Sequence, residues 1–234
     1  MSPNSPLDSP PDVGVLIAAG GRGERAGTGE PKQFRPIAGM PMLLRAIRPF
    51  TQHPRVRRIV VALPPEFAAR PPAWLAGLRG ERLTLVAGGA TRTASVRAAL
   101  AALDAGCRVV LVHDAARPFV SLEEIDGVIT AAAGGVGALA ALPVADTLKQ
   151  ASDAGRVVRT VPRDDLWRAL TPQGFPRAML EEAYRAAGDG TTATDDAGLV
   201  EALGRSVVLV PGSVANFKVT TADDFVVAEA LARL

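Results

Sequence analysis

The stretch His113-Asp114-Ala115-Ala116-Arg117-Pro118 follows the apolar run at residues 109–112 and precedes the helix-start pattern Ser121-Leu122-Glu123-Glu124. A buried strand that ends in a carboxylate and a guanidinium, followed by a helix, is typical of an open α/β sheet. Ligands bind such sheets at the carboxyl ends of the strands. An Asp and an Arg at this edge suit a hydroxylated, phosphorylated or metal-bound substrate. A structural salt bridge at the strand end is the alternative interpretation.

The same alternation of strand and helix extends along the chain. The last predicted helix has Thr221 as its N-cap, with Asp224 at the third helical position. Strands are predicted at residues 13–18, 58–63, 83–86, 109–112, 137–142 and 207–210, and helices at residues 42–50, 94–103, 122–133, 177–187, 196–203 and 222–234. Near-continuous apolar strands that alternate with helices predict a doubly wound, mainly parallel α/β sheet covered on both faces. We expect residues 13–234 to form a single domain.

Residues 143–163 break this alternation. Two strand-like pieces, 146–150 and 156–161, flank the turn Ser152-Asp153-Ala154-Gly155, which is a hairpin pattern. Because an isolated hairpin buries little of itself, we expect it to project as a β-arm and to pack on a second subunit. An antiparallel edge strand pair of the main sheet is the alternative.

Composition excludes several classes of protein. With 234 residues, of which 48% are hydrophobic, the chain can bury a sizeable core. The net charge is only +2, and the 26 Lys and Arg residues are spread along the chain, so we expect no nucleic-acid partner. No apolar stretch reaches the ~20 residues of a membrane span, and residues 1–12 are predicted to be a disordered tail. The single cysteine, Cys107, excludes an intrachain disulfide and fits a reducing cytoplasm.

The first predicted strand leads into a glycine-rich loop. Five glycines occupy positions between 20 and 29, with Arg25 within the loop and Lys32 after it. Glycines let backbone N–H groups approach an anion closely, so the loop is predicted to bind phosphate. It lacks the Gly-Lys-Ser/Thr of the Walker pattern, and it departs from the dinucleotide fingerprint because Ala26 stands where the third glycine would be. A solvent-exposed loop is the alternative.

A second glycine motif, Gly88-Gly89-Ala90-Thr91-Arg92-Thr93-Ala94-Ser95-Val96, opens the helix after the third strand. The paired glycines permit close backbone contact with a planar base. The Ser95 hydroxyl can donate or accept a hydrogen bond there, and Arg92 adds charge nearby. An ordinary strand–helix turn with Thr and Ser caps is the alternative.

These motifs occur in one order together with Asp146-Thr147, Thr171-Pro172-Gln173 and Lys218-Val219-Thr220. The ordered set resembles the 2-C-methyl-D-erythritol 4-phosphate cytidylyltransferases of the non-mevalonate isoprenoid pathway. The resemblance implies a Rossmann-like nucleotidyltransferase fold, a homodimer joined by the β-arm, and transfer of CMP from CTP to methylerythritol phosphate. The family writes its first loop Ala-Ala-Gly-x-Gly-x-Arg, whereas this chain has one additional residue there. Counting back from Lys32 aligns Gly21, Gly23 and Arg25 with the family's positions.

The resemblance assigns roles to the cations. It implies that Arg25 and Lys32 stabilise the transition state at the α-phosphate, and that Arg163 and Lys218 hold the attacking phosphate. Repulsion between two anions is the main obstacle to such a reaction, so positioning and electrostatics replace a general base. We therefore expect neither His53 nor His113 to act as a catalytic base.

The remaining assignments concern the nucleotide and the alcohol. Residues assigned to the nucleotide are Gly21, Gly23, Gly88, Gly89, Arg92 and Ser95. Asp114 is expected to receive hydroxyls of the erythritol, Thr147 and Arg117 to contact substrate across the dimer, and Thr171 to bind substrate. Mg²⁺ is expected to be held mainly by the CTP phosphates, with no dedicated protein ligand.

Three alternative functions remain open from the sequence. Another cytidylyltransferase of the same fold, acting on a pentitol phosphate such as ribitol 5-phosphate, would share the cations. A non-catalytic nucleotide-binding module is disfavoured because both Lys32 and Lys218 are present. A nicotinamide dehydrogenase is disfavoured by the broken fingerprint.

Overall fold

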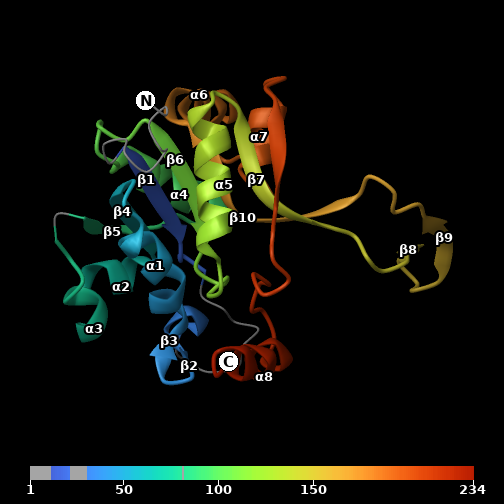
Figure 1. Cartoon of the computed structure of the whole chain (residues 1–234), viewed down its shortest axis with the longest axis horizontal. Coiled ribbons are helices and arrows are strands. Elements are labelled where there is room, and N and C mark those ends of the chain that lie inside the picture. The colour runs from blue at the N-terminus through green and yellow to red at the C-terminus, as the bar shows by residue number, and fades with distance from the viewer. Residues whose placement is uncertain (1–11, 22–30, 81) are drawn as a thin grey trace, which may run out of the picture.

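The computed structural model describes residues 12–21, 31–80 and 82–234 (Figure 1). Most of the predicted N-terminal tail, together with Gly23 and Arg25, lies outside the described residues. Asp12, the last residue of that predicted tail, is buried and pairs with Arg55 at 2.8 Å. The folded part of the chain therefore already includes residue 12.

A seven-stranded sheet with the order β11-β7-β10-β6-β1-β4-β5 forms the centre of the fold. Its strands are β1 (Val13–Ala18), β4 (Val56–Leu63), β5 (Leu83–Ala87), β6 (Val109–Asp114), β7 (Gly137–Pro143), β10 (Trp167–Pro176) and β11 (Val207–Pro211). Among the described strands of this sheet, only β10 runs antiparallel to its neighbours. The prediction of a mainly parallel α/β sheet is confirmed.

Helices cover both faces of this sheet. They are α1 (Met42–Gln52), α2 (Pro65–Ala69), α3 (Ala73–Ala76), α4 (Arg92–Ala101), α5 (Leu122–Ala133), α6 (Arg177–Ala187), α7 (Ala197–Glu201) and α8 (Ala222–Leu231). Val15 and Ile17 of β1 join a buried cluster with α1 and α5, whereas Leu16 joins the opposite cluster with α4, α6 and α7. Alternate strand residues thus enter two cores, as a doubly wound sheet requires.

The starts of α5 and α8 follow the predicted capping chemistry. The Ser121 hydroxyl accepts the Glu124 N–H at 3.2 Å, and the Glu124 carboxylate accepts the Ser121 N–H at 2.9 Å. Thr221 and Asp224 form the same reciprocal pair at α8. Each capping box satisfies backbone donors that the first helical turn leaves unpaired. None of the helices in the described part of the chain is long and apolar enough to cross a membrane.

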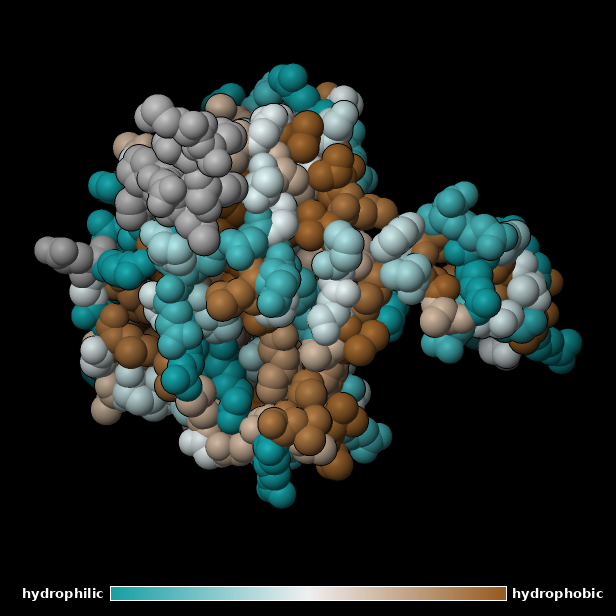
Figure 2. All heavy atoms as spheres, in the orientation of Figure 1, coloured by the Kyte–Doolittle hydropathy of each residue, from teal (hydrophilic) through white to brown (hydrophobic). Residues whose placement is uncertain are grey.

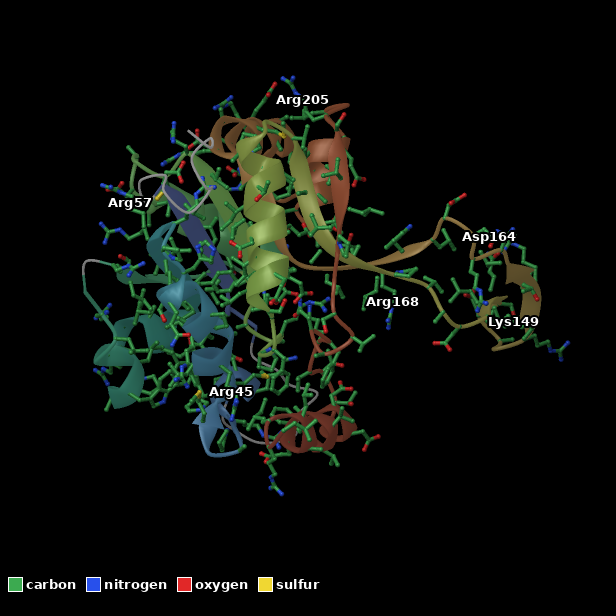
Figure 3. All side chains as sticks on the ribbon, in the orientation of Figure 1. Arg45, Arg57, Lys149, Asp164, Arg168 and Arg205 are labelled. Atoms are coloured by element: carbon green, nitrogen blue, oxygen red, sulfur yellow. The ribbon has the colours of Figure 1, made fainter. Side chains whose placement is uncertain are left out.

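The hairpin prediction is confirmed, and the edge-strand alternative is wrong. β8 (Leu148–Ala151) and β9 (Val157–Val161) pair with each other in a separate two-stranded sheet. The hairpin stands clear of the main body and carries both polar and apolar residues (Figure 2). Val157 and Val158 are more than half exposed there. The side chains of Lys149 and Asp164 lie on this projection, with Arg168 nearer the body (Figure 3).

Strand β10 is the main element that the sequence did not predict. Its sequence contains two prolines and a glycine, which are typical of a loop. Pairing with β6 and β7 on both sides overrides that local preference. The pairing with β7 is interrupted between Ala169 and Gln173, so Pro172, which has no N–H, lies where no ladder bond is needed. Short strands β2 (Pro36–Ile37) and β3 (Met40–Pro41) and the 3-10 turn η3 (Lys32–Phe34) complete the described fold.

Candidate active site

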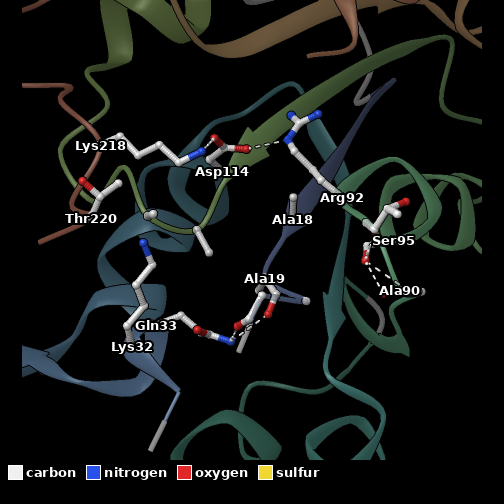
Figure 4. Close-up of a pocket in the computed structure, with 16 residues that line it drawn as sticks. Ala18, Ala19, Lys32, Gln33, Ala90, Arg92, Ser95, Asp114, Lys218 and Thr220 are labelled. Carbon is white, nitrogen blue, oxygen red and sulfur yellow. Dashed lines mark hydrogen bonds and ion pairs between the residues drawn. The ribbon is translucent and has the colours of Figure 1, made fainter. Parts of the chain in front are cut away.

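A cavity of about 380 Å³ lies at the carboxyl ends of β1 and β6. Its walls come from the exit of β1, the η3 turn, the start of α4, the end of β6 and the segment before α8 (Figure 4). The lining residues are Ala18, Ala19, Gly20, Gly21, Lys32, Gln33, Gly89, Ala90, Thr91, Arg92, Ser95, Asp114, Ala115, Ala116, Lys218 and Thr220. This is the edge of the sheet where the sequence predicted a ligand site.

The Asp114 carboxylate bridges two cations in the cavity wall. One oxygen accepts from Arg92 Nε at 3.0 Å, and the other accepts from Lys218 Nζ at 2.8 Å. Burial alone would raise the pKa of Asp114, but Arg92 and Lys218 outweigh it and hold that pKa well below its usual range. Asp114 is therefore ionised at neutral pH and keeps acceptor capacity toward the cavity.

Lys32 reaches the cavity from the η3 turn, and its ammonium group donates to the Val219 carbonyl at 2.8 Å. Val219 directly follows Lys218, so the two lysines are joined through one stretch of backbone. Lys32 and Lys218 come from distant parts of the chain, yet both line the cavity, as the sequence predicted. Two ammonium groups on one cavity make it suited to a polyanion.

Gln33 is a cavity residue to which the sequence analysis gave no role. Its buried side-chain amide donates to the Ala19 carbonyl at 2.8 Å and to the Gly21 carbonyl at 3.0 Å. These contacts hold the first part of the glycine loop against η3. The signal was its position directly after Lys32 in the sequence Pro31-Lys32-Gln33.

The second glycine motif forms the capped strand–helix turn and also contributes to the cavity wall, whereas its contact with a base stays a prediction. Thr91 caps α4 by accepting the Ala94 N–H at 3.0 Å, which is the ordinary turn chemistry. A Cβ on Gly88 would lie 2.7 Å from Ser95 Oγ, so Gly88 is required for packing, and it does not line the cavity. Gly89 does line it, and its N–H donates to Ser95 Oγ at 3.2 Å. The motif therefore shapes one cavity wall by close packing of the loop on the helix.

His113 and Thr171 lie behind the wall and anchor Asp114. The Asp114 N–H donates to Thr171 Oγ1 at 3.1 Å, and that hydroxyl lies 2.9 Å from His113 Nδ1. His113 Nε2 lies 3.0 Å from the Arg117 carbonyl, so the network assigns the ring proton to Nε2. Burial lowers the pKa of His113 to about 4, which keeps the ring neutral at pH 7. These positions agree with the expectation that His113 is no catalytic base.

Arg117 is buried and does not line the cavity. Its guanidinium donates to the Asn216 carbonyl at 2.8 Å and to the Ala169 carbonyl at 3.4 Å. Burial lowers its pKa from the ordinary value. Within one chain, Arg117 thus ties the end of β6 to β10 and to the segment that carries Lys218.

Two further predicted residues lie on the arm. Thr147 and Arg163 are exposed and do not line the cavity of their own chain. Arg163 instead contacts the Ala145 carbonyl across the base of the arm. The predicted residues that the structure brings together in the cavity are Gly21, Lys32, Gly89, Arg92, Ser95, Asp114 and Lys218.

The doubly wound sheet, with a glycine-lined and lysine-bearing cavity at its carboxyl edge, defines an α/β protein of the nucleotidyltransferase-like type. Comparison with known proteins narrows this class. The model of the 2-C-methyl-D-erythritol 4-phosphate cytidylyltransferase family matches residues 13–233. The chain belongs to this family, and it is therefore a nucleotidyltransferase.

Relatives and solved structures agree with that assignment. The chain is 48% identical over 223 residues to the 2-C-methyl-D-erythritol 4-phosphate cytidylyltransferase of Saccharopolyspora erythraea, covering 94% of this chain and 98% of that one. It is 47% identical over 222 residues to the enzyme of the same name from Frankia casuarinae, covering 94% and 81%. The crystal structure of that enzyme from Thermus thermophilus superposes with a TM-score of 0.81 at 41% identity, covering 95% of this chain and all of that chain.

Proposed function

We propose that this chain transfers CMP from CTP to 2-C-methyl-D-erythritol 4-phosphate, giving 4-diphosphocytidyl-2-C-methyl-D-erythritol and pyrophosphate for isoprenoid precursor synthesis. The observation that carries the proposal is the convergence of Lys32, Lys218 and Asp114 on one cavity. Two cations and one carboxylate match an acceptor that is both phosphorylated and hydroxylated.

The chemistry needs little more than positioning. An oxygen of the acceptor phosphate attacks the α-phosphorus of CTP, the bond to the bridging oxygen of the β-phosphate breaks, and pyrophosphate leaves. Lys32 stabilises the charge that develops at the α-phosphate, and Lys218 holds the attacking phosphate beside it. The neutral, fully buried His113 takes no part in proton transfer. Arg25, which lies outside the described residues, is proposed to share the transition-state role of Lys32.

The acceptor's hydroxyls are assigned to Asp114. Its carboxylate is ionised and accepts hydrogen bonds only, so it favours O–H donors over a second anion. Arg92 and Lys218 balance its charge and fix its orientation. The nucleotide is assigned to the wall formed by Gly21, Gly89 and Ser95.

Mg²⁺ forms part of the proposal. Within the described ranges, no group of three or more His, Cys, Asp or Glu side chains could hold a metal ion. Among the described residues that line the cavity, Asp114 is the one carboxylate, and two cations already engage it. This donor set fits an ion that is held by phosphates and retains its waters. When bound, Mg²⁺ supplies neutralisation of the triphosphate charge.

The arm supports a homodimer. It presents Val157 and Val158 to solvent, and a two-stranded hairpin is marginally stable when it is unsupported. Thr147 and Arg163 lie on the arm and away from the cavity of their own chain. In a dimer, they would reach the cavity of the second subunit. A cytoplasmic location, suggested by the single, buried cysteine, completes the proposal.

A pyrophosphate-release assay tests the proposal. CTP, ATP, GTP and UTP are each combined with methylerythritol phosphate and with ribitol 5-phosphate. Release that requires CTP and methylerythritol phosphate is expected. Preferential use of ribitol 5-phosphate would make the chain a pentitol-phosphate cytidylyltransferase. No release with either acceptor would remove the catalytic proposal.

A further inference from the structure

A series of ion pairs, called the relay below, leads from the cavity wall into the core. Its members are Lys218, Asp114, Arg92 and Asp196. Arg92 is the first residue of α4, and its guanidinium lies between two carboxylates. Nε donates to Asp114 Oδ1 at 3.0 Å, and Nη2 lies 2.8 Å from Asp196 Oδ2. A cation at a helix N-terminus faces the positive end of the helix dipole, so the two carboxylates offset an unfavourable placement.

Asp196 is fully buried and is fixed from three directions. Its second carboxylate oxygen accepts from the hydroxyl of Tyr184 on α6. Its backbone N–H donates to Gln173 Oε1 at 2.9 Å, and Gln173 Nε2 donates to Asp195 at 3.0 Å. The Gln of the Thr-Pro-Gln motif thus positions the Asp-Asp pair that precedes α7.

The charges of the relay alternate. Asp196, Arg92, Asp114 and Lys218 follow one another in space as carboxylate, guanidinium, carboxylate and ammonium, and of the four only Asp196 does not line the cavity. Burial raises the pKa of Asp196, and the paired Arg92 guanidinium opposes this shift and favours the carboxylate. The Arg92–Asp196 contact is at ion-pair distance but is not an aligned hydrogen bond. Neither Arg92 Nη2 nor Asp196 Oδ2 has a hydrogen-bond partner elsewhere. Asp196 therefore acts on Arg92 mainly through charge.

We infer that Asp196 is a positioning residue for the alcohol half of the site, which rests on the proposed function. Asp196 neutralises the inner side of Arg92. Without that charge, Arg92 has only Asp114 as a carboxylate partner and binds it more tightly. Asp114 then has less acceptor capacity for the substrate's hydroxyls. The sequence assigns Arg92 to the nucleotide, but the ion pairs that Arg92 makes are with Asp114 and Asp196, so a change at Asp196 acts first on Asp114.

The test compares three single variants of the full-length protein. Asp196→Asn removes the charge at constant shape, and Tyr184→Phe removes only the hydroxyl that orients it. The matched control is Asp12→Asn, because Asp12 is also buried and pairs with Arg55 at 2.8 Å and Arg108 at 3.0 Å at the opposite end of β1. Michaelis constants for CTP and the alcohol phosphate, turnover number and melting temperature are measured for each.

Asp196→Asn is expected to raise the Michaelis constant of the alcohol phosphate about 10-fold, equivalent to about 1.4 kcal/mol, and to change that of CTP less than about twofold. Tyr184→Phe should give a smaller rise in the same direction, and it tests the inference even if Asp196→Asn does not fold. Asp12→Asn should lower the melting temperature but should not change the Michaelis constant of the alcohol phosphate relative to that of CTP. Equal effects on both substrates, or the same split in Asp12→Asn, would overturn the inference.

A double-mutant comparison tests the route through Asp114. In an Asp114→Asn background, Asp196→Asn should no longer weaken binding of the alcohol phosphate, measured by calorimetry with a non-hydrolysable CTP analogue present. An undiminished effect there would show that Asp196 acts elsewhere. If the unaltered protein uses a different alcohol phosphate, the proposed function is wrong, and the same comparison is made with that acceptor.

Discussion

Replacing Lys32 by Met removes one ammonium group from the cavity at nearly constant side-chain length. A unit charge about 4 Å from charge that develops at phosphorus, at an effective dielectric constant of about 20, contributes about 4 kcal/mol. Screening by solvent in an open cavity reduces this value, so we expect the turnover number to fall about 10²–10³-fold, as when an oxyanion-hole donor is removed. Single-turnover pyrophosphate release measures the chemical step, and calorimetry measures CTP binding, which should weaken much less.

The control for this variant is Arg205→Met. Arg205 is exposed and forms a surface ion pair with Glu182 at 3.0 Å, and such pairs contribute little. It does not line the cavity, so its loss removes a charge of the same sign outside the site. Its turnover number should be unchanged. A Lys32→Met enzyme with nearly normal turnover and a raised Michaelis constant for CTP would refute the reasoning, because Lys32 would then anchor only the ground state.

Three further predictions follow from the site and the arm. CTP should be preferred to UTP if, as proposed, the backbone at Gly89 pairs with the exocyclic group of the base, because a mismatch there costs about 1–3 kcal/mol; equal turnover with both would contradict this. Mixing Thr147→Val and Lys32→Met subunits should restore part of the activity if the arm completes the partner's site, whereas verified subunit exchange without recovery would reject a shared site. The lowered pKa of His113, about 4 against an ordinary 6.5, means that the unfolded chain binds more protons between these values. The free energy of unfolding should therefore lose about 2 kcal/mol between pH 7 and pH 5 in urea titrations, and His113→Gln should remove that part of the slope.

Local sequence patterns predicted the helices and strands that have one continuous apolar or amphipathic pattern. The bounds of β1, α5 and α6 agree with the sequence prediction residue for residue. Each has an unbroken apolar or amphipathic pattern, and α5 also has a complete capping box. Strand β10 escaped prediction because its pairing partners, β6 and β7, decide its conformation, and no local pattern carries that information.

The candidate site was predictable in part, because several of its residues stand in local motifs. Lys32, Asp114 and Lys218 stand in ordered motifs at strand and helix ends, and the parallel sheet brings those ends together. Sequence position does not determine which way a side chain points: Thr171 lies behind the cavity wall of its own chain, where its hydroxyl contacts His113. Arg117 also lies behind that wall, and its expected contact with substrate across a dimer stays a prediction. Asp196 gave no signal, because its contact with Arg92 depends on the packing of α6 and α7 against α4.

The hydrogen bond from Lys32 to the Val219 carbonyl spans 187 residues of sequence. During synthesis from the N-terminus, most of the central sheet emerges before this contact can form. A nascent chain that stops short of Val219 has its strands but not the backbone that joins the two lysines of the cavity. Catalytic competence therefore comes last during synthesis, because the cavity is complete only after Lys218 and Val219 have emerged.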